Sequence, residues 1–314
     1  MNRWQVGILV IAASFLGILL YVISAKPVLA PDLKNRTELN SVQNFVNNFS
    51  GKQDISILLT GDIMLGRSVM GVSLKKGDPT YPFLKVGDTL AGADLVFANL
   101  ENPIIEKCPS ISSGFKFCAD PKMIDGLTFA GIDVVNIANN HSGNYGKEGV
   151  SQTENFLSKA GIDYTGDGNL VVKEVNGTKF GFLGFDYVDF APKDKDFQLT
   201  SDSKQKVDVL IVAVHWGLEY TTDPTKSQKL IAKNLVGAGA DVVYGTHPHW
   251  VQSIDHINGK PVYYSLGNFI FDQMWSEETR RGLVMKLTYR DRKLIGEEKL
   301  PIYMQNFAQP EWEK

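Results

Sequence analysis

Short apolar runs recur along the chain from residue 54 onward, and polar residues or glycines bound each of them. Near-continuous runs rich in Val, Ile and Leu are typical of strands that are buried on both faces of a sheet. Segments that fit helices lie between them, over residues 121–130, 147–160 and 225–238. Strands that alternate with helices predict an α/β fold. The predicted strands cover residues 54–61, 95–97, 134–137, 207–214 and 242–244.

A four-residue pattern, Ala-Gly-x-Asp, recurs at residues 91–94, 130–133, 160–163 and 238–241. Three of the four copies lead into an apolar, β-branched run. We interpret the pattern as a helix that ends at a left-handed glycine, followed by a tight turn and a buried strand. The irregular spacing excludes a solenoid. A partly antiparallel section is predicted in the last third, where strand-like segments cover residues 262–266, 283–289 and 293–300.

The N-terminus departs from this pattern, because residues 6–23 are almost wholly apolar and uncharged. About 20 apolar residues span a bilayer. We therefore expect an uncleaved transmembrane signal-anchor, with a cleaved signal peptide as the alternative. The predicted organisation is an anchor at 1–25, a linker at 26–53, a folded domain at 54–300 and a C-terminal tail at 301–314.

Composition and cysteine usage narrow the class of protein. The 314 residues carry a formal charge of −3, and no basic stripe is interleaved with aromatics, so nucleic acid is excluded as a partner. Only two cysteines occur, Cys108 and Cys118, separated by nine residues. In an exported protein this spacing suits a local disulfide, worth about 2–3 kcal/mol, and two reduced cysteines are the alternative. We favour a domain outside the cytoplasm. The segment at 191–206 carries alternating charges and is predicted to be a solvated, mobile loop.

Polar side chains follow five of the predicted strands at the point where each strand ends. In open α/β sheets, ligands bind at the carboxyl ends of the strands. Four of the five histidines of the chain fall at these positions. The residues concerned are Asp62, Asn99, Glu101, Asn139, Asn140, His141, His215, Glu219, His247 and His249.

Nitrogen and oxygen are the only ligand atoms in this set. Imidazole combined with carboxylate suits Mn, Zn or Fe, and a paired site activates water for attack on a phosphoryl or acyl centre. Singly, each residue has an ordinary explanation: Asp62 can cap a helix, and Asn140 can satisfy a turn. Their joint placement, with a proline between His247 and His249, predicts one polar pocket. No G-x-S-x-G elbow, P-loop or G-x-G-x-x-G motif offers a competing chemistry.

Six short motifs occur in order along the chain: Gly61-Asp62, Asn99-Leu100-Glu101, Asn139-Asn140-His141, His215-Trp216-Gly217-x-Glu219, Gly245-x-His247-Pro248-His249 and Ser265-Leu266-Gly267-Asn268-Phe269. In this order they resemble the CapA-type proteins of bacterial poly-gamma-glutamate capsule synthesis, also called PgsA-type. The resemblance covers about residues 54–272, and the anchor with an outward domain also fits that family.

More distantly, that family resembles the calcineurin-like metallophosphoesterases. This resemblance implies a four-layer α-β-β-α sandwich with one or two divalent transition-metal ions. Asp62 and His249 would bind a first metal, Glu101 would bridge, and His141 would be the acid that protonates the leaving group. The implied ligands of a second metal are Asn140, His215 and His247, and the implied pocket residues are Asn99, Asn139, Glu219 and Asn268.

One position departs from the metallophosphoesterase pattern. Those enzymes carry an Asp-x-His pair at the first strand, whereas the third residue here is Met64. The first metal subsite therefore lacks one imidazole, and Glu219 or water is the expected replacement. The number of metals, one or two, stays open.

The resemblance implies a membrane-anchored cell-surface protein with a metal-dependent hydrolase-type site. It would act in the synthesis, release or attachment of an anionic polymer such as poly-gamma-glutamate, with capsule synthase subunits as partners. The alternative is a non-catalytic subunit that binds the polymer or scaffolds a membrane synthase. A third hypothesis is a general phosphodiesterase.

Overall fold

The structure is a computed structural model that describes residues 53–166 and 168–313. These belong to one compact unit, residues 52–314. The predicted anchor and all but the last residue of the predicted linker lie outside the described residues. Within the described part of the chain, no helix is both long and apolar enough to cross a membrane.

The first sheet is mixed, with a parallel half and an antiparallel half. Its strand order is β14-β13-β12-β1-β2-β3-β4, and β11 pairs in parallel with β1. The antiparallel half confirms the prediction for the last third of the chain. The strands are β1 (Ile55–Ile63), β2 (Leu95–Leu100), β3 (Val134–Asn136), β4 (Asp163–Thr165), β11 (Asn268–Ile270), β12 (Arg281–Arg290), β13 (Lys293–Asn306) and β14 (Gln309–Trp312).

The second sheet has the order β5-β6-β7-β8-β10-β9. Its four central strands are parallel, and β5 and β9 are antiparallel at the edges. The strands are β5 (Val171–Val175), β6 (Thr178–Asp186), β7 (Val209–His215), β8 (Val242–Thr246), β9 (Ile254–Ile257) and β10 (Lys260–Tyr263).

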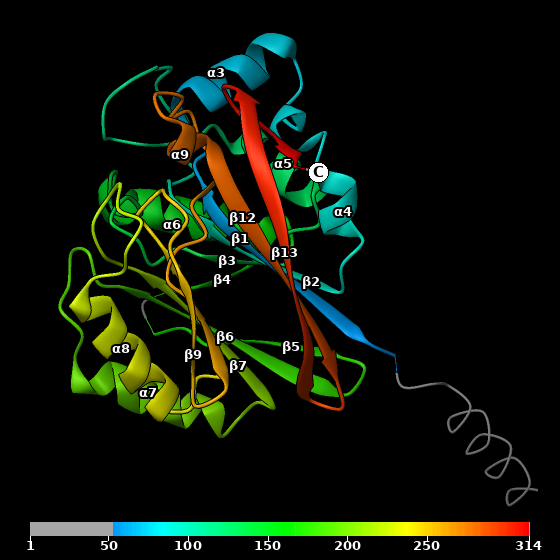
Figure 1. Cartoon of the computed structure of the whole chain (residues 1–314). Coiled ribbons are helices and arrows are strands. Elements are labelled where there is room, and N and C mark those ends of the chain that lie inside the picture. The colour runs from blue at the N-terminus through cyan, green and yellow to red at the C-terminus, as the bar shows by residue number, and fades with distance from the viewer. Residues whose placement is uncertain (1–52, 167, 314) are drawn as a thin grey trace, which may run out of the picture. The chain divides into compact units, whose positions relative to one another are not determined.

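Figure 1 shows the helices and the two sheets in layers, and three apolar cores lie between these layers. Alternation along β1 places Leu59 between the sheets and Leu58 against the helices of the first sheet. Between the sheets, Phe97 meets Phe182 and Tyr244 edge-to-face, at centroid distances of 4.9 and 5.2 Å. The layers therefore run helix, sheet, sheet, helix, as the resemblance implied. The helices are α3 (Arg67–Lys76), α4 (Gly87–Ala91), α5 (Ile124–Phe129) and α6 (Gly146–Lys159) beside the first sheet, α7 (Asp194–Lys204) and α8 (Lys226–Gly237) beside the second, with short elements η1 (Tyr81–Phe83), η2 (Pro121–Met123) and α9 (Glu277–Arg280).

Three of the four Ala-Gly-x-Asp glycines have the predicted left-handed backbone. Gly131, Gly161 and Gly239 have φ values of 65°, 75° and 112°. Gly92 has a φ of −80°, so the prediction is wrong there, because α4 ends in a right-handed turn.

The aspartate of the pattern has a structural role at the amino ends of the strands. In three copies its carboxylate accepts a backbone N–H from the neighbouring strand. This contact fixes the position at which each strand enters the sheet. The bonds run from Ser56 to Asp94 (2.8 Å), from Val96 to Asp133 (2.8 Å) and from Leu210 to Asp241 (2.9 Å).

The predicted loop at 191–206 and the predicted tail at 301–314 are wrong. Residues 191–206 are not a loop, because α7 occupies most of them and packs Phe197 against the core beside the second sheet. The Asp196 carboxylate accepts the Lys193 N–H at 2.9 Å and begins that helix. Residues 301–314 are not a tail, because β13 continues through residue 306 and β14 pairs with it.

Candidate metal centre

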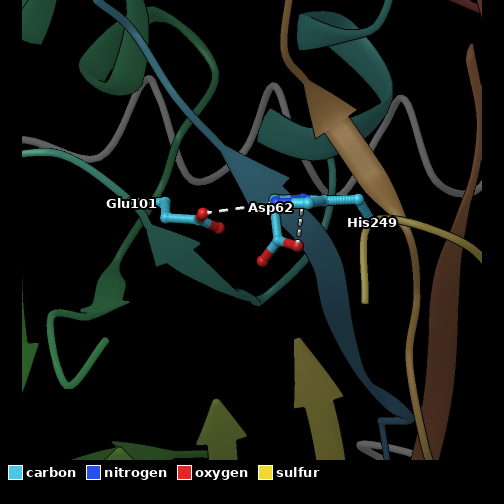
Figure 2. Close-up of side chains that lie close together, drawn as sticks. All are labelled: Asp62, Glu101 and His249. Carbon is cyan, nitrogen blue, oxygen red and sulfur yellow. Dashed lines mark ion pairs between the residues drawn. The ribbon is translucent and has the colours of Figure 1, made fainter. Parts of the chain in front are cut away.

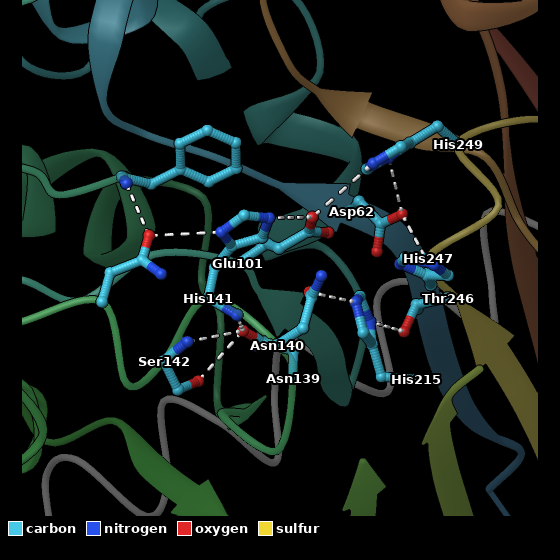
Figure 3. A network of polar contacts seen from close by, with 12 residues as sticks. Asp62, Glu101, Asn139, Asn140, His141, Ser142, His215, Thr246, His247 and His249 are labelled. Carbon is cyan, nitrogen blue, oxygen red and sulfur yellow. Dashed lines mark hydrogen bonds and ion pairs between the residues drawn. The ribbon is translucent and has the colours of Figure 1, made fainter. Parts of the chain in front are cut away.

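Strands from both sheets deliver polar side chains to one buried site, shown in Figure 3. Parallel strands end on the same side of a sheet, and here the two sheets place those ends next to each other. Each of the six charged or imidazole side chains predicted as ligands or acid is at most 8% exposed. They are Asp62 near the carboxyl end of β1, Glu101 after β2, His141 after β3, His215 at the end of β7, and His247 and His249 after β8.

A first subsite is formed by Asp62, Glu101 and His249 (Figure 2). One ligand atom from each lies within 4.8 Å of the others. His249 Nδ1 is 3.3 Å from Asp62 Oδ2, and His249 Nε2 is 3.7 Å from Glu101 Oε1. Burial, and then the charge of Asp62, raise the pKa of Glu101 well above its usual range. A cation between the two carboxylates would remove this repulsion.

Asn268 sets the orientation of His249. Its Nδ2 donates to Gln273 Oε1 (3.0 Å) and to Thr279 O (2.9 Å), so its Oδ1 is the accepting side of the amide. This oxygen lies 2.9 Å from His249 Nδ1, which therefore carries the proton. The lone pair of His249 Nε2 is then free on the side of Glu101. Such a second partner fixes the tautomer of metal-binding histidines.

Asn140, His215 and His247, the predicted ligands of a second metal, lie close together and are called the second subsite here. His215 Nε2 lies 3.0 Å from Asn140 Oδ1, and the two imidazole rings are 4.9 Å apart between centroids. Burial lowers the pKa of His215 well below its ordinary value, and it lowers the pKa of His247 to about 4. Both rings are therefore neutral at pH 7, which is the form that binds metals.

The His-Pro-His turn has a backbone that non-glycine residues rarely adopt. His247 has a φ of 95° and His249 a φ of 59°. The His247 N–H donates to Asp62 Oδ2 at 3.2 Å, which holds the turn against β1. Strained backbone of this kind collects at functional sites. The turn thus brings both imidazoles to one place, although their side chains serve different subsites.

Two buried polar atoms of the site lack a hydrogen-bond partner among the described residues. They are Glu101 Oε1 and His247 Nδ1. Such atoms are rare in native structures and call for a specific explanation. A divalent metal accepts a lone pair from both kinds of atom, and the carboxylate and imidazole donor set is that of Mn, Zn or Fe. The residues present therefore fit divalent metal binding.

Asn99 and Asn139 support the ligands. Asn99 Nδ2 donates to Asp62 Oδ1 at 2.8 Å, and its Oδ1 accepts from Asn136 Nδ2 at 2.9 Å. Asn139 Oδ1 accepts the backbone N–H of His141 at 3.2 Å. Asn99 thus orients a carboxylate, whereas Asn139 shapes the loop that carries Asn140 and His141.

Met64 and Glu219 do not complete the first subsite. Met64 is fully buried in the core between the first sheet and its helices, and its Sδ accepts the Gly66 N–H at 3.1 Å. Glu219 is exposed, and its negative charge contributes to the raised pKa of Glu101. The first subsite therefore has one imidazole, that of His249.

His141 lies between the first subsite and the loop that follows β2. Its Nε2 is 4.0 Å from Glu101 Oε1, and its Nδ1 is 3.2 Å from Asn144 Oδ1. Burial lowers the pKa of His141. The predicted disulfide, Cys108–Cys118, is confirmed and closes that loop.

Several residues that contact the predicted site residues were not predicted from the sequence. Asn136 interrupts an apolar run and Thr246 ends one, which is a signal of a polar site at a strand end. The others follow no pattern, because tertiary packing alone brings them to the site. They are Asn136, Thr246, Asn144, Gln273 and Phe117.

Comparison with known proteins agrees with the motifs. A model of the family described as Bacterial capsule synthesis protein PGA_cap matches residues 56–206 and 198–273. The chain belongs to this family. It is 31% identical over 282 residues to Capsule biosynthesis protein CapA of Bacillus anthracis, covering 81% of this chain and 68% of that protein. It is 32% identical over 254 residues to PGA biosynthesis protein CapA of Bacillus subtilis, covering 73% and 67%.

Two solved structures share the fold. A hypothetical protein from Thermus thermophilus aligns with a TM-score of 0.54 at 16% identity, covering 79% of this chain and 98% of its own. A phosphatase from Mycoplasma pneumoniae aligns with a TM-score of 0.51 at 16% identity, covering 81% and 95%. At this identity the likeness concerns the fold alone.

Proposed function

We propose that this member of the PGA_cap family acts in the synthesis, release or attachment of an anionic capsule polymer such as poly-gamma-glutamate, through a metal-dependent hydrolase-type site. The observation that carries the proposal is that two buried atoms, Glu101 Oε1 and His247 Nδ1, have no hydrogen-bond partner in the part of the chain that the structure describes. They belong to two adjacent subsites at the carboxyl ends of the strands. The relatives from two Bacillus species, named for capsule and PGA biosynthesis, support the polymer class.

The predicted ligands form two groups, and each group would hold one divalent ion. Asp62, Glu101 and His249 would hold one divalent ion, and Asn140, His215 and His247 a second. When bound, the metal supplies Lewis acidity toward a carbonyl or phosphoryl oxygen and lowers the pKa of a bound water.

His141 would transfer the proton to the leaving group. Nε2 is its nitrogen on the side of Glu101, at 4.0 Å from the carboxylate. Burial lowers the pKa of His141, whereas the hydrogen bond to Asn144 and the charge of Glu219 act in the opposite direction. The imidazolium form donates from Nε2. In the neutral form the same nitrogen presents a lone pair and acts as a base.

Surface charge alone does not explain recognition of an anionic polymer. Arg280 ends α9 and Arg281 begins β12, and each pairs with a carboxylate, that of Glu277 or of Glu313. Binding through the metal centre is therefore the simpler route. The proposal includes an N-terminal membrane anchor, a domain outside the cytoplasm and synthase subunits as partners. The confirmed disulfide suits that compartment.

A second candidate function is a non-catalytic subunit that binds the polymer or scaffolds the synthase. The core position of Met64 favours it, because the first subsite keeps only one imidazole. A metal bound there would have fewer protein ligands than in an Asp-x-His enzyme.

The test begins with the metal content of the full chain beside a His247→Ala/His249→Ala variant. We expect one or two equivalents of Mn, Zn or Fe in the wild type and loss of the metal in the variant. The Mn-loaded chain is then incubated with poly-gamma-glutamate, and polymer length is followed by gel electrophoresis. Shortening that disappears in His141→Gln supports the hydrolase.

Other outcomes separate the alternatives. Metal retention without hydrolysis of polymer, amide or phosphoester substrates would favour the scaffold. Turnover of an aryl phosphodiester without cleavage of the polymer would favour a general phosphodiesterase. A wild-type chain that binds none of the three metals would contradict the metal centre itself.

A further inference from the structure

The loop closed by the Cys108–Cys118 disulfide contacts His141 through Phe117. The two rings are stacked, with centroids 3.9 Å apart and planes inclined by 25°. The Arg67 guanidinium also lies over the Phe117 ring, with its Cζ 4.5 Å from the centroid. Arg67 Nη1 donates to the Gly114 carbonyl of the same loop at 2.9 Å. The loop is thus attached to the domain at the point where it meets the imidazole.

Asn144 links the loop to the edge of the imidazole. Its Oδ1 accepts the backbone N–H of Phe117 at 2.6 Å and lies 3.2 Å from His141 Nδ1. A backbone N–H can only donate, so the atom facing it is the amide oxygen and not the amide nitrogen. Nδ1 is therefore the donor to this oxygen. His141 Nε2 is left as the nitrogen that faces Glu101.

We propose that this disulfide-closed loop positions His141, with Phe117 and Asn144 as its positioning residues. The proposal rests on the proposed function, in which His141 transfers a proton at Nε2. A neutral histidine in water prefers its proton on Nε2. The contact with Asn144 reverses that preference and keeps Nε2 available to accept or deliver a proton at the site.

The disulfide acts at the residues that touch the imidazole. Phe117 and Cys118 are 3% and 2% exposed, whereas Phe115, two residues earlier, is 78% exposed. The base of the loop is buried and its tip lies in solvent. Closing a loop covalently restricts the conformations of the chain between the cysteines. Opening it would release the Phe117 ring and N–H, because Phe117 directly precedes Cys118.

The test is the tautomer of His141, measured by long-range proton–nitrogen NMR on the metal-free full chain with labelled histidine at neutral pH. The chain has five histidines, so the His141 signal is assigned by its loss in His141→Gln. We expect the Nδ1–H tautomer in the wild type. We expect a mixture with Nε2–H in Asn144→Ala and in Cys108→Ser/Cys118→Ser. Asn144→Asp keeps an acceptor oxygen and is expected to restore the wild-type tautomer.

Phe115→Ala is the matched control, because it changes the exposed tip of the same loop and should leave the signal unchanged. An Nε2–H tautomer in the wild type, or an unchanged Nδ1–H tautomer in Asn144→Ala, would overturn the proposal. The Asn144 variants decide the question even if the serine pair does not fold. The spectra need neither metal nor substrate, so a chain that lacks metal or activity would contradict the proposed function and leave this result readable.

Discussion

Two carboxylates lie at opposite ends of the strands and have opposite surroundings; Asp241 is partly buried and Glu101 is fully buried. Asp241 precedes β8, at the amino end, and accepts from Lys204 Nζ and Lys260 Nζ at 2.6 Å each and from the Leu210 N–H at 2.9 Å. Glu101 follows β2, at the carboxyl end, and is fully buried. Its Oε1 lacks a hydrogen-bond partner within the described part of the chain.

The difference appears in the acidity of the two groups. Burial alone would raise the pKa of Asp241, but the hydrogen bonds from Lys204 and Lys260 outweigh it and lower that pKa. Burial raises the pKa of Glu101, and the charge of Asp62 adds to this. A buried charge with its partners in place maintains the fold, whereas one without them marks a place for a cation. The carboxylate at the amino ends of the strands therefore stabilises the fold, whereas the one at the carboxyl ends belongs to the candidate metal centre.

The largest expected effect is on metal affinity, and matched carboxylate-to-amide changes measure it. Glu101→Gln should weaken Mn²⁺ binding on the order of 100-fold or more, because it removes a charged ligand shared by the site. Asp241→Asn should leave the affinity unchanged. Isothermal titration of both variants measures the difference. Equal affinities in the two would remove the distinction between the ends of the sheets.

Stability of the metal-free chain should change in opposite directions in the same pair. Asp241→Asn should lower the free energy of unfolding by about 2 kcal/mol, since it removes two partly exposed ion pairs. Glu101→Gln should raise it by about 1 kcal/mol, because a neutral amide replaces a buried carboxylate whose Oε1 has no hydrogen-bond donor among the described residues. Urea unfolding of both variants tests this. A destabilised Glu101→Gln would mean that the carboxylate has a structural partner.

A smaller effect on metal affinity is expected for Asn268, which contacts the predicted ligand His249. Asn268→Ala should weaken Mn²⁺ binding by about 10-fold, because His249 loses the acceptor that fixes its tautomer. Asn268→Asp keeps that acceptor and should bind nearly as well as the wild type. The same titration separates them, and equal losses in both variants would point to packing rather than orientation.

The sequence predicts the site better than the edges of the fold. Predicted ligands such as Asp62 and His215 come after apolar runs, near the carboxyl ends of their strands. Parallel strands end on the same side of a sheet, so the convergence of these residues follows from the local pattern. Asn144 and Phe117 reach His141 only through tertiary packing, which no spacing encodes. The sequence therefore predicts the ligands but not what orients them.

The wrong predictions for residues 191–206 and 301–314 each have a physical reason. The buried face of α7 includes Thr200 and Ser203, so its pattern is that of a polar segment. β14 contains Pro310, which argues against a strand, but an edge strand tolerates proline because one side needs no partner. In both cases tertiary contacts decide the structure: α7 packs against the core beside the second sheet, and β14 pairs with β13.

The smallest expected effect is the pH dependence of the stability differences in the metal-free chain. Asp241 has a folded pKa below its ordinary 3.8, so its contribution is present above pH 3.8 and is lost as the pH falls through the folded value. Glu101 has a folded pKa above 4.5, so the free-energy cost of its charge is absent below pH 4.5 and grows as the pH rises from there.

The stability deficit of Asp241→Asn should therefore shrink below pH 3.8. The gain of Glu101→Gln should appear only above pH 4.5, with a change of about 1 kcal/mol. Urea unfolding across pH 3 to 8 measures both, and parallel curves for the two variants would mean that the ends of the sheets do not differ in this way.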